Sequence, residues 1–162
     1  MKSYNILFLC TGNSARSILA EALVTTLSHG KFIGYSAGSN PSGRVNPFAS
    51  ELAMALGYPK EKLRSKNWDE YSSPDSPQMD FIITVCDNAA NEVCPVWLGH
   101  PSTAHWGFPD PASVEGTDAI KREVFKKTLL ALKKNIEALI KLPIDQLDSS
   151  SLKKAIQDIH HA

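Results

Sequence analysis

The chain has 162 residues, enough for one domain with a substantial core. Its 43% hydrophobic and 21% charged residues are typical of an ordinary globular protein. Basic and acidic residues balance at 17 each, so the charge predicts neither nucleic-acid binding nor a strongly charged partner. The N-terminal apolar run, 6–10, is too short for an export signal or a membrane span. We therefore expect a cytoplasmic protein without membrane contact.

The cysteines are Cys10, Cys86 and Cys94. Three cysteines in a cytoplasmic chain argue against a framework of structural disulfides. They are either inert buried thiols or reactive ones, and their positions must decide. No two of them have the Cys-x-x-Cys spacing of a metal site, so we expect no bound metal.

The first forty residues alternate between strand and helix patterns. Tyr4 to Leu9 is a short, mostly apolar run that predicts a buried strand. From Ala15, apolar residues recur three and four apart and predict a helix that stops at Gly30. Phe32 to Ala37 predicts a second strand. A strand–helix–strand unit of this kind has a right-handed crossover.

Helix and strand patterns continue to alternate along the rest of the chain. We predict a helix from Pro47 to Gly57, a strand from Phe81 to Val85, a helix from Thr117 to Leu142 and a short helix from Ser150 to Ile159. The range 95–111 holds four prolines and predicts an ordered loop or a short fourth strand.

This order predicts an α/β fold: a single-domain, three-layer sandwich in which a four-stranded parallel sheet carries helices on both faces. The domain spans 1–162, with a core of about 4–142 and a C-terminal extension, 144–162. Ligands of such sheets bind beyond the carboxyl ends of the strands. Cys10 and Cys86 each follow a predicted strand, which suggests that they share a site.

The loop after the first strand has the features of an anion site. It consists of Cys10, Thr11, Gly12, Asn13, Ser14, Ala15, Arg16 and Ser17. A loop that opens a helix directs backbone N–H groups and the positive end of the helix dipole at one point. Asn13 tolerates a left-handed backbone, and Arg16 can donate two N–H groups to a tetrahedral anion.

The same positive surroundings predict a lowered pKa for the Cys10 thiol, which would make it a nucleophilic thiolate. We also expect the Ser17 hydroxyl to contact the Cys10 sulfur. A buried cysteine beside a helix cap is the alternative, but the combination of strand, Gly, Asn, Arg and helix favours the site.

These residues resemble the low-molecular-weight protein tyrosine phosphatase family. The resemblance runs from about 4 to 140 and includes the Cys10-x5-Arg16-Ser17 loop, Glu21, Ser36-Ala37-Gly38 and Asp110-Pro111. It implies that Cys10 is the nucleophile, that Arg16 binds the oxyanion and that Asp110 protonates the leaving group. A carboxyl above the anion, on a loop stiffened by proline, suits that acid role.

Two activities fit the resemblance. One is hydrolysis of phosphomonoesters through a Cys10 phosphoenzyme, with Asp110 as general acid. The other is reduction of arsenate to arsenite. The stretch Val85-Cys86-Asp87 to Val93-Cys94-Pro95, followed by His105-Trp106-Gly107, resembles the arsenate reductase branch of the family. Hydrolysis needs one thiol, whereas a two-electron reduction needs two.

The resemblance to reductases implies a relay of thiols. Cys10 attacks arsenate, Cys86 attacks the Cys10 sulfur as arsenite leaves, and Cys94 then forms a disulfide with Cys86. An external thiol donor, either thioredoxin or glutathione with glutaredoxin, restores the thiols. We expect no bound cofactor, an arsenate or phosphate-like oxyanion as ligand, and a monomer. A non-enzymatic oxyanion sensor is a further alternative.

Some reductases of this family bind potassium near the loop, through positions that match Asn13, Glu21 and Ser36 and through an aspartate. Where that aspartate is expected, this chain reads Leu63-Arg64-Ser65-Lys66. We hypothesise that the Lys66 ammonium fills the cation position and makes activity insensitive to potassium. An exposed Lys66 is the alternative.

Overall fold

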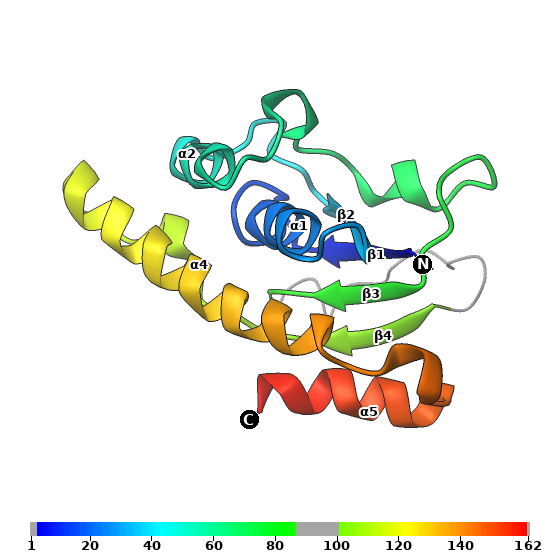
Figure 1. The fold of residues 1–162 in the computed structure, drawn as a ribbon. Coiled ribbons are helices and arrows are strands. Elements are labelled where there is room, and N and C mark those ends of the chain that lie inside the picture. The colour runs from blue at the N-terminus through cyan, green and yellow to red at the C-terminus, as the bar shows by residue number, and fades with distance from the viewer. Residues whose placement is uncertain (1–2, 87–100, 162) are drawn as a thin grey trace.

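The computed structural model describes residues 3–86 and 101–161. The strands are β1 (Tyr4–Leu9), β2 (Phe32–Ala37), β3 (Phe81–Thr84) and β4 (Ser102–His105). The α-helices are α1 (Arg16–Leu27), α2 (Pro47–Ala55), α4 (Asp118–Ile140) and α5 (Ser149–His160). Short 3-10 helices are η1 (Lys60–Lys62), η2 (Trp68–Tyr71), η3 (Pro111–Ser113) and η4 (Ile144–Gln146). Figure 1 shows their arrangement.

Every predicted strand and α-helix is present, with ends that differ by a few residues at most. The open alternative for 95–111 is decided in favour of a short strand, β4. Local signals explain the helix starts. The Asn46 side chain accepts a hydrogen bond from the Phe48 N–H ahead of α2, and Pro47 is its first residue. The 3-10 helices were not predicted, because turns of three or four residues have no readable periodicity.

The four strands form one parallel sheet, as predicted, and their order is β2-β1-β3-β4. After β1 the chain crosses to β2 on one side and later returns to β3 on the other side. In sheets of this kind ligands bind where the strand order reverses, which here is at the carboxyl ends of β1 and β3. Leu9 pairs with Thr84 in the sheet, so the segments that follow the two strands begin side by side.

Alternate residues of β1 face the two sides of the sheet. Ile6 and Phe8 belong to the main core, which includes buried residues of α1, α4 and α5. Leu7 and Leu9 belong to a smaller cluster on the opposite face, closed by Trp68 of η2. The alternation is the two-residue period of a strand that is buried on both faces.

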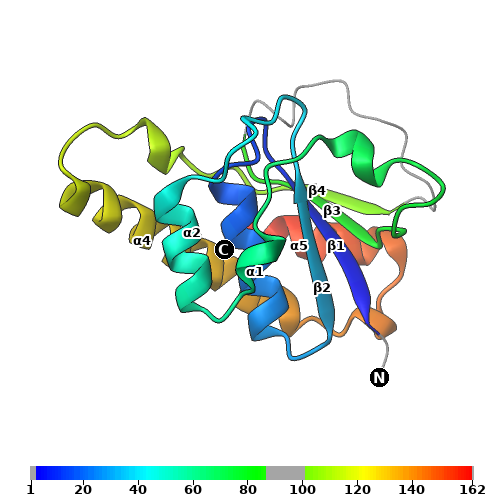
Figure 2. The ribbon, with the colours of Figure 1, turned by 90° about the horizontal axis from the view of Figure 1, so that it is seen from above.

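Helix α1 is the central helix of the molecule (Figure 2). It contacts the sheet, α2 and α4, and eight consecutive residues, 17–24, are buried. At the other end of the chain, α5 packs against β4 (Figure 1). None of the helices in the described ranges is both long and apolar enough to cross a membrane.

Candidate active site

Cys10 and Cys86 lie together at the carboxyl ends of β1 and β3. Each follows its strand within two residues, and both side chains are buried. The Cys86 sulfur accepts from the N–H of Thr11, the residue after Cys10, at 3.3 Å. The pairing of β1 with β3 thus brings the two cysteines together, and their joint role in one site stays a prediction.

The loop between Cys10 and α1 is held by buried polar contacts. Asn13 has a φ of 45°, the left-handed backbone that was predicted for it. Its side-chain Nδ2 donates to Ser17 Oγ at 2.8 Å, and its Oδ1 accepts from the Lys66 N–H at 2.9 Å. Ser65 Oγ donates to the Gly12 carbonyl at 3.1 Å. These contacts within the chain hold the loop in its shape.

One nitrogen of the Arg16 guanidinium is hydrogen-bonded to the protein backbone, and another can donate to a ligand. Its Nη1 donates to the Phe108 carbonyl at 2.7 Å. Its Nε is buried and has no acceptor among the described residues. A buried donor without a partner costs about 1–3 kcal/mol, which an oxyanion oxygen would recover. The start of α1 also lacks a side-chain cap and an acidic residue, so its positive end is open to an anion.

Two members of the predicted loop make contacts that the sequence did not suggest. The Thr11 N–H donates to Cys86 Sγ at 3.3 Å, which stabilises negative charge on that second sulfur. Ser17 Oγ accepts from Asn13, and a Ser17 bond to Cys10 is not among the hydrogen bonds of the described residues. The groups that act on the Cys10 pKa are instead the Cys86 thiol, which raises it, and the Arg16 charge and the Gly12 N–H, which lower it.

The predicted direction of the Cys10 pKa is wrong for this arrangement. The hydrogen bond to Cys86 and burial raise the pKa of the Cys10 thiol above its usual range. The Arg16 charge and the Gly12 N–H act in the opposite direction but are outweighed. The prediction considered only the positive charge around the loop. Two adjacent buried thiols share a proton, and loss of the protons from both would place two negative charges side by side.

Asp110 lies at the edge of the site. Its Oδ2 is 3.9 Å from Arg16 Nη2, and its side chain is 44% exposed. Its Oδ1 accepts from the Ala112 N–H at 2.9 Å, which caps η3. The Asp110 carboxylate therefore caps a turn and also lies beside Arg16.

Lys66 is buried behind the loop, with its side chain only 5% exposed. Its ammonium lies 3.7 Å from Glu21 Oε1, 3.4 Å from Ser36 Oγ and 3.5 Å from Asn13 Oδ1. Its best hydrogen bond, at 2.8 Å, is to the Arg64 carbonyl. The three predicted cation-site residues thus surround this ammonium group, and the alternative of an exposed Lys66 is wrong.

The buried carboxylate of Glu21 is the centre of this cluster. Ser36 Oγ donates to Glu21 Oε1 at 2.6 Å, and the Tyr58 hydroxyl donates to Oε2. Burial raises the pKa of Glu21 and lowers the pKa of Lys66, and in each case the opposite charge of the partner counteracts the effect. Sequence reasoning missed Tyr58, because its position 37 residues from Glu21 carries no local signal.

Cys94 lies outside the described residues, so its relation to Cys86 stays a prediction. Sequence reasoning also missed the Phe108 carbonyl, which anchors Arg16. A backbone acceptor has no residue-type signature. The Phe108 carbonyl reaches the start of α1 because β4 lies beside β3 in the sheet.

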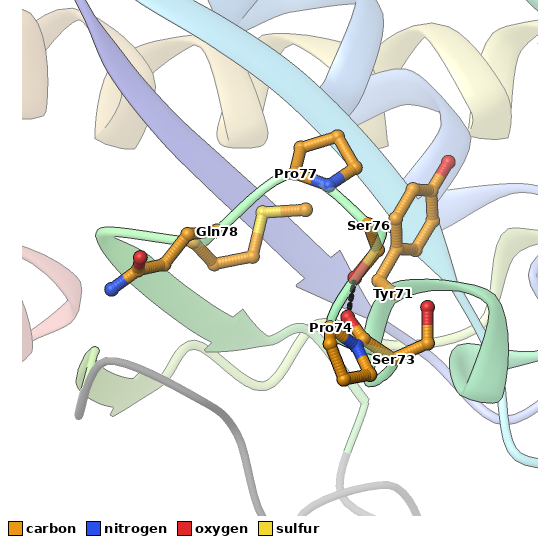
Figure 3. Close-up of a pocket in the computed structure, with 7 residues that line it drawn as sticks. Tyr71, Ser73, Pro74, Ser76, Pro77 and Gln78 are labelled. Carbon is orange, nitrogen blue, oxygen red and sulfur yellow. Dashed lines mark hydrogen bonds between the residues drawn. The ribbon is translucent and has the colours of Figure 1, made fainter.

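A pocket between η2 and β3 lies apart from the oxyanion loop (Figure 3). Its lining consists of Tyr71, Ser73, Pro74, Ser76, Pro77, Gln78 and Met79, and Ser76 Oγ donates to the Ser73 carbonyl at 2.6 Å. The lining offers no cationic group for an oxyanion. In the described part of the chain, no group of three or more His, Cys, Asp and Glu side chains could hold a metal ion.

Gly38 packs directly against the backbone of the catalytic loop. A Cβ atom there would lie 2.4 Å from the carbonyl oxygens of both Cys10 and Thr11. At Gly12 the nearest atom to an added Cβ is Ser14 Oγ, at 3.8 Å. The chain thus needs glycine for close approach at Gly38, and has room for a methyl group at Gly12.

We predict that Gly38→Ala lowers the free energy of unfolding by about 1–3 kcal/mol, because the backbone of the loop must move. The matched variant Gly12→Ala should change stability by about 0.5 kcal/mol or less. Urea unfolding followed by circular dichroism measures both. Equal effects of the two substitutions would contradict the close contact at Gly38.

The raised Cys10 pKa predicts a response to removal of its neighbour. In a Cys94→Ala background, Cys86→Ala should lower the Cys10 pKa, because the largest cause of the rise disappears. Arg16→Ala should raise it further, because a favourable charge is lost. The rate of Cys10 alkylation by iodoacetamide, followed from pH 5 to 10 by peptide mass spectrometry, reports the midpoint. A midpoint that moves upward in Cys86→Ala would contradict Cys86 as the main cause of the raised Cys10 pKa.

Comparison with known proteins agrees with this geometry. Residues 5–157 match the family of the low molecular weight phosphotyrosine protein phosphatase. An arsenate reductase of Halalkalibacterium halodurans is 36% identical over 132 residues, 82% of this chain and 91% of that protein. A solved arsenate reductase in the oxidized state superposes with a TM-score of 0.66 at 27% identity, over 85% of this chain and 96% of that chain.

A thioredoxin-dependent arsenate reductase of Corynebacterium glutamicum shares the fold, with a TM-score of 0.54 at 23% identity over 83% of this chain and 62% of that chain. The family predicted from the Cys10 loop is confirmed. The chain belongs to the low molecular weight phosphotyrosine protein phosphatase family and, within it, is similar to arsenate reductases.

Proposed function

We propose that this chain reduces arsenate to arsenite and uses Cys10 as its nucleophile. The observation that carries the proposal is the burial of Cys86 directly beside Cys10, where the Cys86 sulfur accepts from the N–H of the next residue, Thr11, at 3.3 Å. Hydrolysis of a phosphate ester requires only one thiol. A two-electron reductase needs a second one, because two thiols supply the electrons when they become a disulfide. The similarity to arsenate reductases over most of the chain supports the same activity.

Arsenate binds in the loop Thr11 to Ser17, above the open positive end of α1. Arg16 donates from Nε and from the Nη atom that faces away from Phe108, which satisfies its buried donor. Thr11 joins this set of donors only when its N–H turns away from Cys86. Binding of the dianion therefore rearranges the contacts between the loop and the second sulfur.

In the first step the Cys10 thiolate attacks arsenic, a sulfur–arsenic bond forms and an arsenic–oxygen bond breaks. Asp110, beside Arg16, protonates the departing oxygen so that it leaves as water. At this stage the proton shared by the two sulfurs resides on Cys86. The raised Cys10 pKa makes this proton transfer a requirement for the reaction.

In the second step Cys86 attacks the Cys10 sulfur, and its proton passes to an oxygen of the departing arsenite. A Cys10–Cys86 disulfide forms, and the sulfur–arsenic bond breaks with its electron pair on arsenic, which leaves as arsenite. The Thr11 N–H favours the anionic form of Cys86. Cys94 then attacks Cys86, frees Cys10 and leaves a Cys86–Cys94 disulfide. Thioredoxin, or glutathione with glutaredoxin, reduces this disulfide.

Hydrolysis of phosphomonoesters is the second candidate function. Cys10, Arg16 and Asp110 would serve it in the same positions, and membership of the phosphatase family favours it. The two functions differ in their use of Cys86 and Cys94, which hydrolysis does not need.

We predict arsenate-dependent oxidation of NADPH when the protein is coupled to thioredoxin and thioredoxin reductase, or to glutathione, glutaredoxin and glutathione reductase. Cys10→Ser, Cys86→Ser and Cys94→Ser should each reduce turnover at least about a hundredfold, because each removes a sulfur of the relay. Hydrolysis of p-nitrophenyl phosphate, measured alongside, should require Cys10 but neither of the other two cysteines. Arsenate turnover that survives Cys86→Ser and Cys94→Ser would exclude the relay. Fast phosphate-ester hydrolysis without arsenate reduction would favour the phosphatase.

The Lys66 ammonium acts as a built-in cation for the loop. It lies among the oxygens of Asn13, Glu21 and Ser36, and it is tied to the loop through Asn13. A fixed ammonium in this position removes the need for a metal ion to neutralise Glu21.

The expected consequence is that arsenate turnover by the wild type is equal in potassium chloride and in tetramethylammonium chloride. Lys66→Ala leaves the oxygens of Asn13, Glu21 and Ser36 without a cation, so its turnover should fall and be partly restored by potassium. Steady-state kinetics at constant ionic strength measure both effects. Several-fold stimulation of the wild type by potassium would refute the assignment of Lys66.

A further inference from the structure

The C-terminal helix α5 contacts the segment that anchors the oxyanion arginine. We call His105 to Phe108 the anchor segment, because the carbonyl of its last residue accepts the hydrogen bond from Arg16. The segment begins at the end of β4, the last strand of the sheet. Helix α5 lies along this strand, as Figure 1 shows.

Gln157 binds the first residue of the anchor segment as a neighbouring strand would. Its Oε1 accepts from the His105 N–H at 2.9 Å, and its Nε2 donates to the His105 carbonyl at 2.8 Å. A single carboxamide group thus satisfies the backbone N–H and the backbone carbonyl of a residue at the edge of the sheet. Beside it, Trp106 Nε1 donates to the Ile156 carbonyl at 2.9 Å, and this indole is fully buried.

His160 holds the other end of the anchor segment. Its ring meets the Phe108 ring edge-on, with centroids 5.0 Å apart. The ring is itself fixed, because Asn135 Nδ2 of α4 lies 3.0 Å from His160 Nδ1. Residues 157 and 160 are one helical turn apart, so the same face of α5 reaches both ends of the segment.

The anchor segment is also supported by β3 and the residue after it. The Trp106 N–H donates to the Thr84 carbonyl at 2.7 Å, and the Phe108 N–H donates to the Val85 carbonyl at 3.0 Å. The segment is therefore held between α5 and the chain that leads into Cys86. A shift on the α5 side would move the Phe108 carbonyl and, with it, the guanidinium of Arg16.

We infer that Gln157 and His160 are positioning residues for oxyanion binding, which act through the anchor segment on Arg16. They fix the Phe108 carbonyl so that Nη1 is occupied and Nε is directed at the anion. A guanidinium that is free to rotate would bind the same anion more weakly, because its orientation would have to be fixed at each binding event. The inference rests on the proposed function only for the identity of the oxyanion.

The test uses the full chain and inorganic phosphate, so that it does not depend on arsenate reduction. Gln157→Met keeps the length of the side chain and removes both hydrogen bonds, and His160→Ala removes the ring. Each should raise the Kd for phosphate about five- to tenfold in titration calorimetry. Lys153→Ala, at an exposed position of the same helix, is the control and should stay within about twofold of the wild type.

A second readout separates positioning from general damage. In phosphate-saturated wild-type protein the Arg16 Nε–H should give a distinct proton–nitrogen NMR signal, assigned by its loss in Arg16→Lys. Both α5 variants should broaden or shift this signal, and the control should not. Melting temperatures identify a variant that does not fold. Should Gln157→Met fail to fold, His160→Ala decides alone, because it lies at the last residue of α5.

A phosphate Kd within twofold of the wild type in the folded variants would overturn the inference. So would a raised Kd with an unchanged Arg16 signal, since the loss would then not pass through Arg16, and so would a wild type that does not bind phosphate. A protein that binds phosphate and shows the predicted losses, but does not reduce arsenate, would refute the proposed function and leave this inference standing.

Discussion

Because β1 and β3 are parallel neighbours, with Leu9 paired to Thr84, the segments that leave their carboxyl ends must start side by side. One segment carries Cys10 and the oxyanion loop, and the other carries Cys86. Backbone pairing thus places the two cysteine side chains next to each other, and both are buried. This contact raises the Cys10 pKa and provides a second thiol for a redox step. The same fold therefore supports a nucleophile at Cys10 and, because a cysteine stands just after β3, also a thiol pair that can supply two electrons.

The loop itself is stabilised from three directions. Lys66 and Asn13 hold it from behind, Gly38 allows the neighbouring chain to pack directly against it, and Phe108 anchors Arg16 in front. These supports lie in segments far apart in the sequence, so the anion site depends on the assembled fold. The buried Nε of Arg16, which has no acceptor among the described residues, is the clearest indication of an anion site, since buried donors are rarely left without an acceptor.

Much of the fold followed from local patterns, and much of the site did not. The strands, the α-helices and the sheet were predictable because apolar periodicity and caps such as Asn46 are read within a few residues. The roles of Cys10 and Arg16 were suggested by a strand, a loop and a helix that are contiguous. Phe108, Tyr58 and Gln157 were missed, because a backbone carbonyl, a hydroxyl and an amide acquire their meaning only from tertiary neighbours. The pKa of Cys10 was predicted in the wrong direction for the same reason, since its dominant partner is 76 positions away.

The central claim is that Cys10 and Cys86 together supply the electrons, and a single turnover tests it most directly. The Cys94→Ser variant, fully reduced and mixed with one equivalent of arsenate, should stop after the second step. Non-reducing peptide mapping should then find a Cys10–Cys86 disulfide, with about one arsenite released per protein. Both thiols still free after incubation, with no arsenite released, would contradict the account.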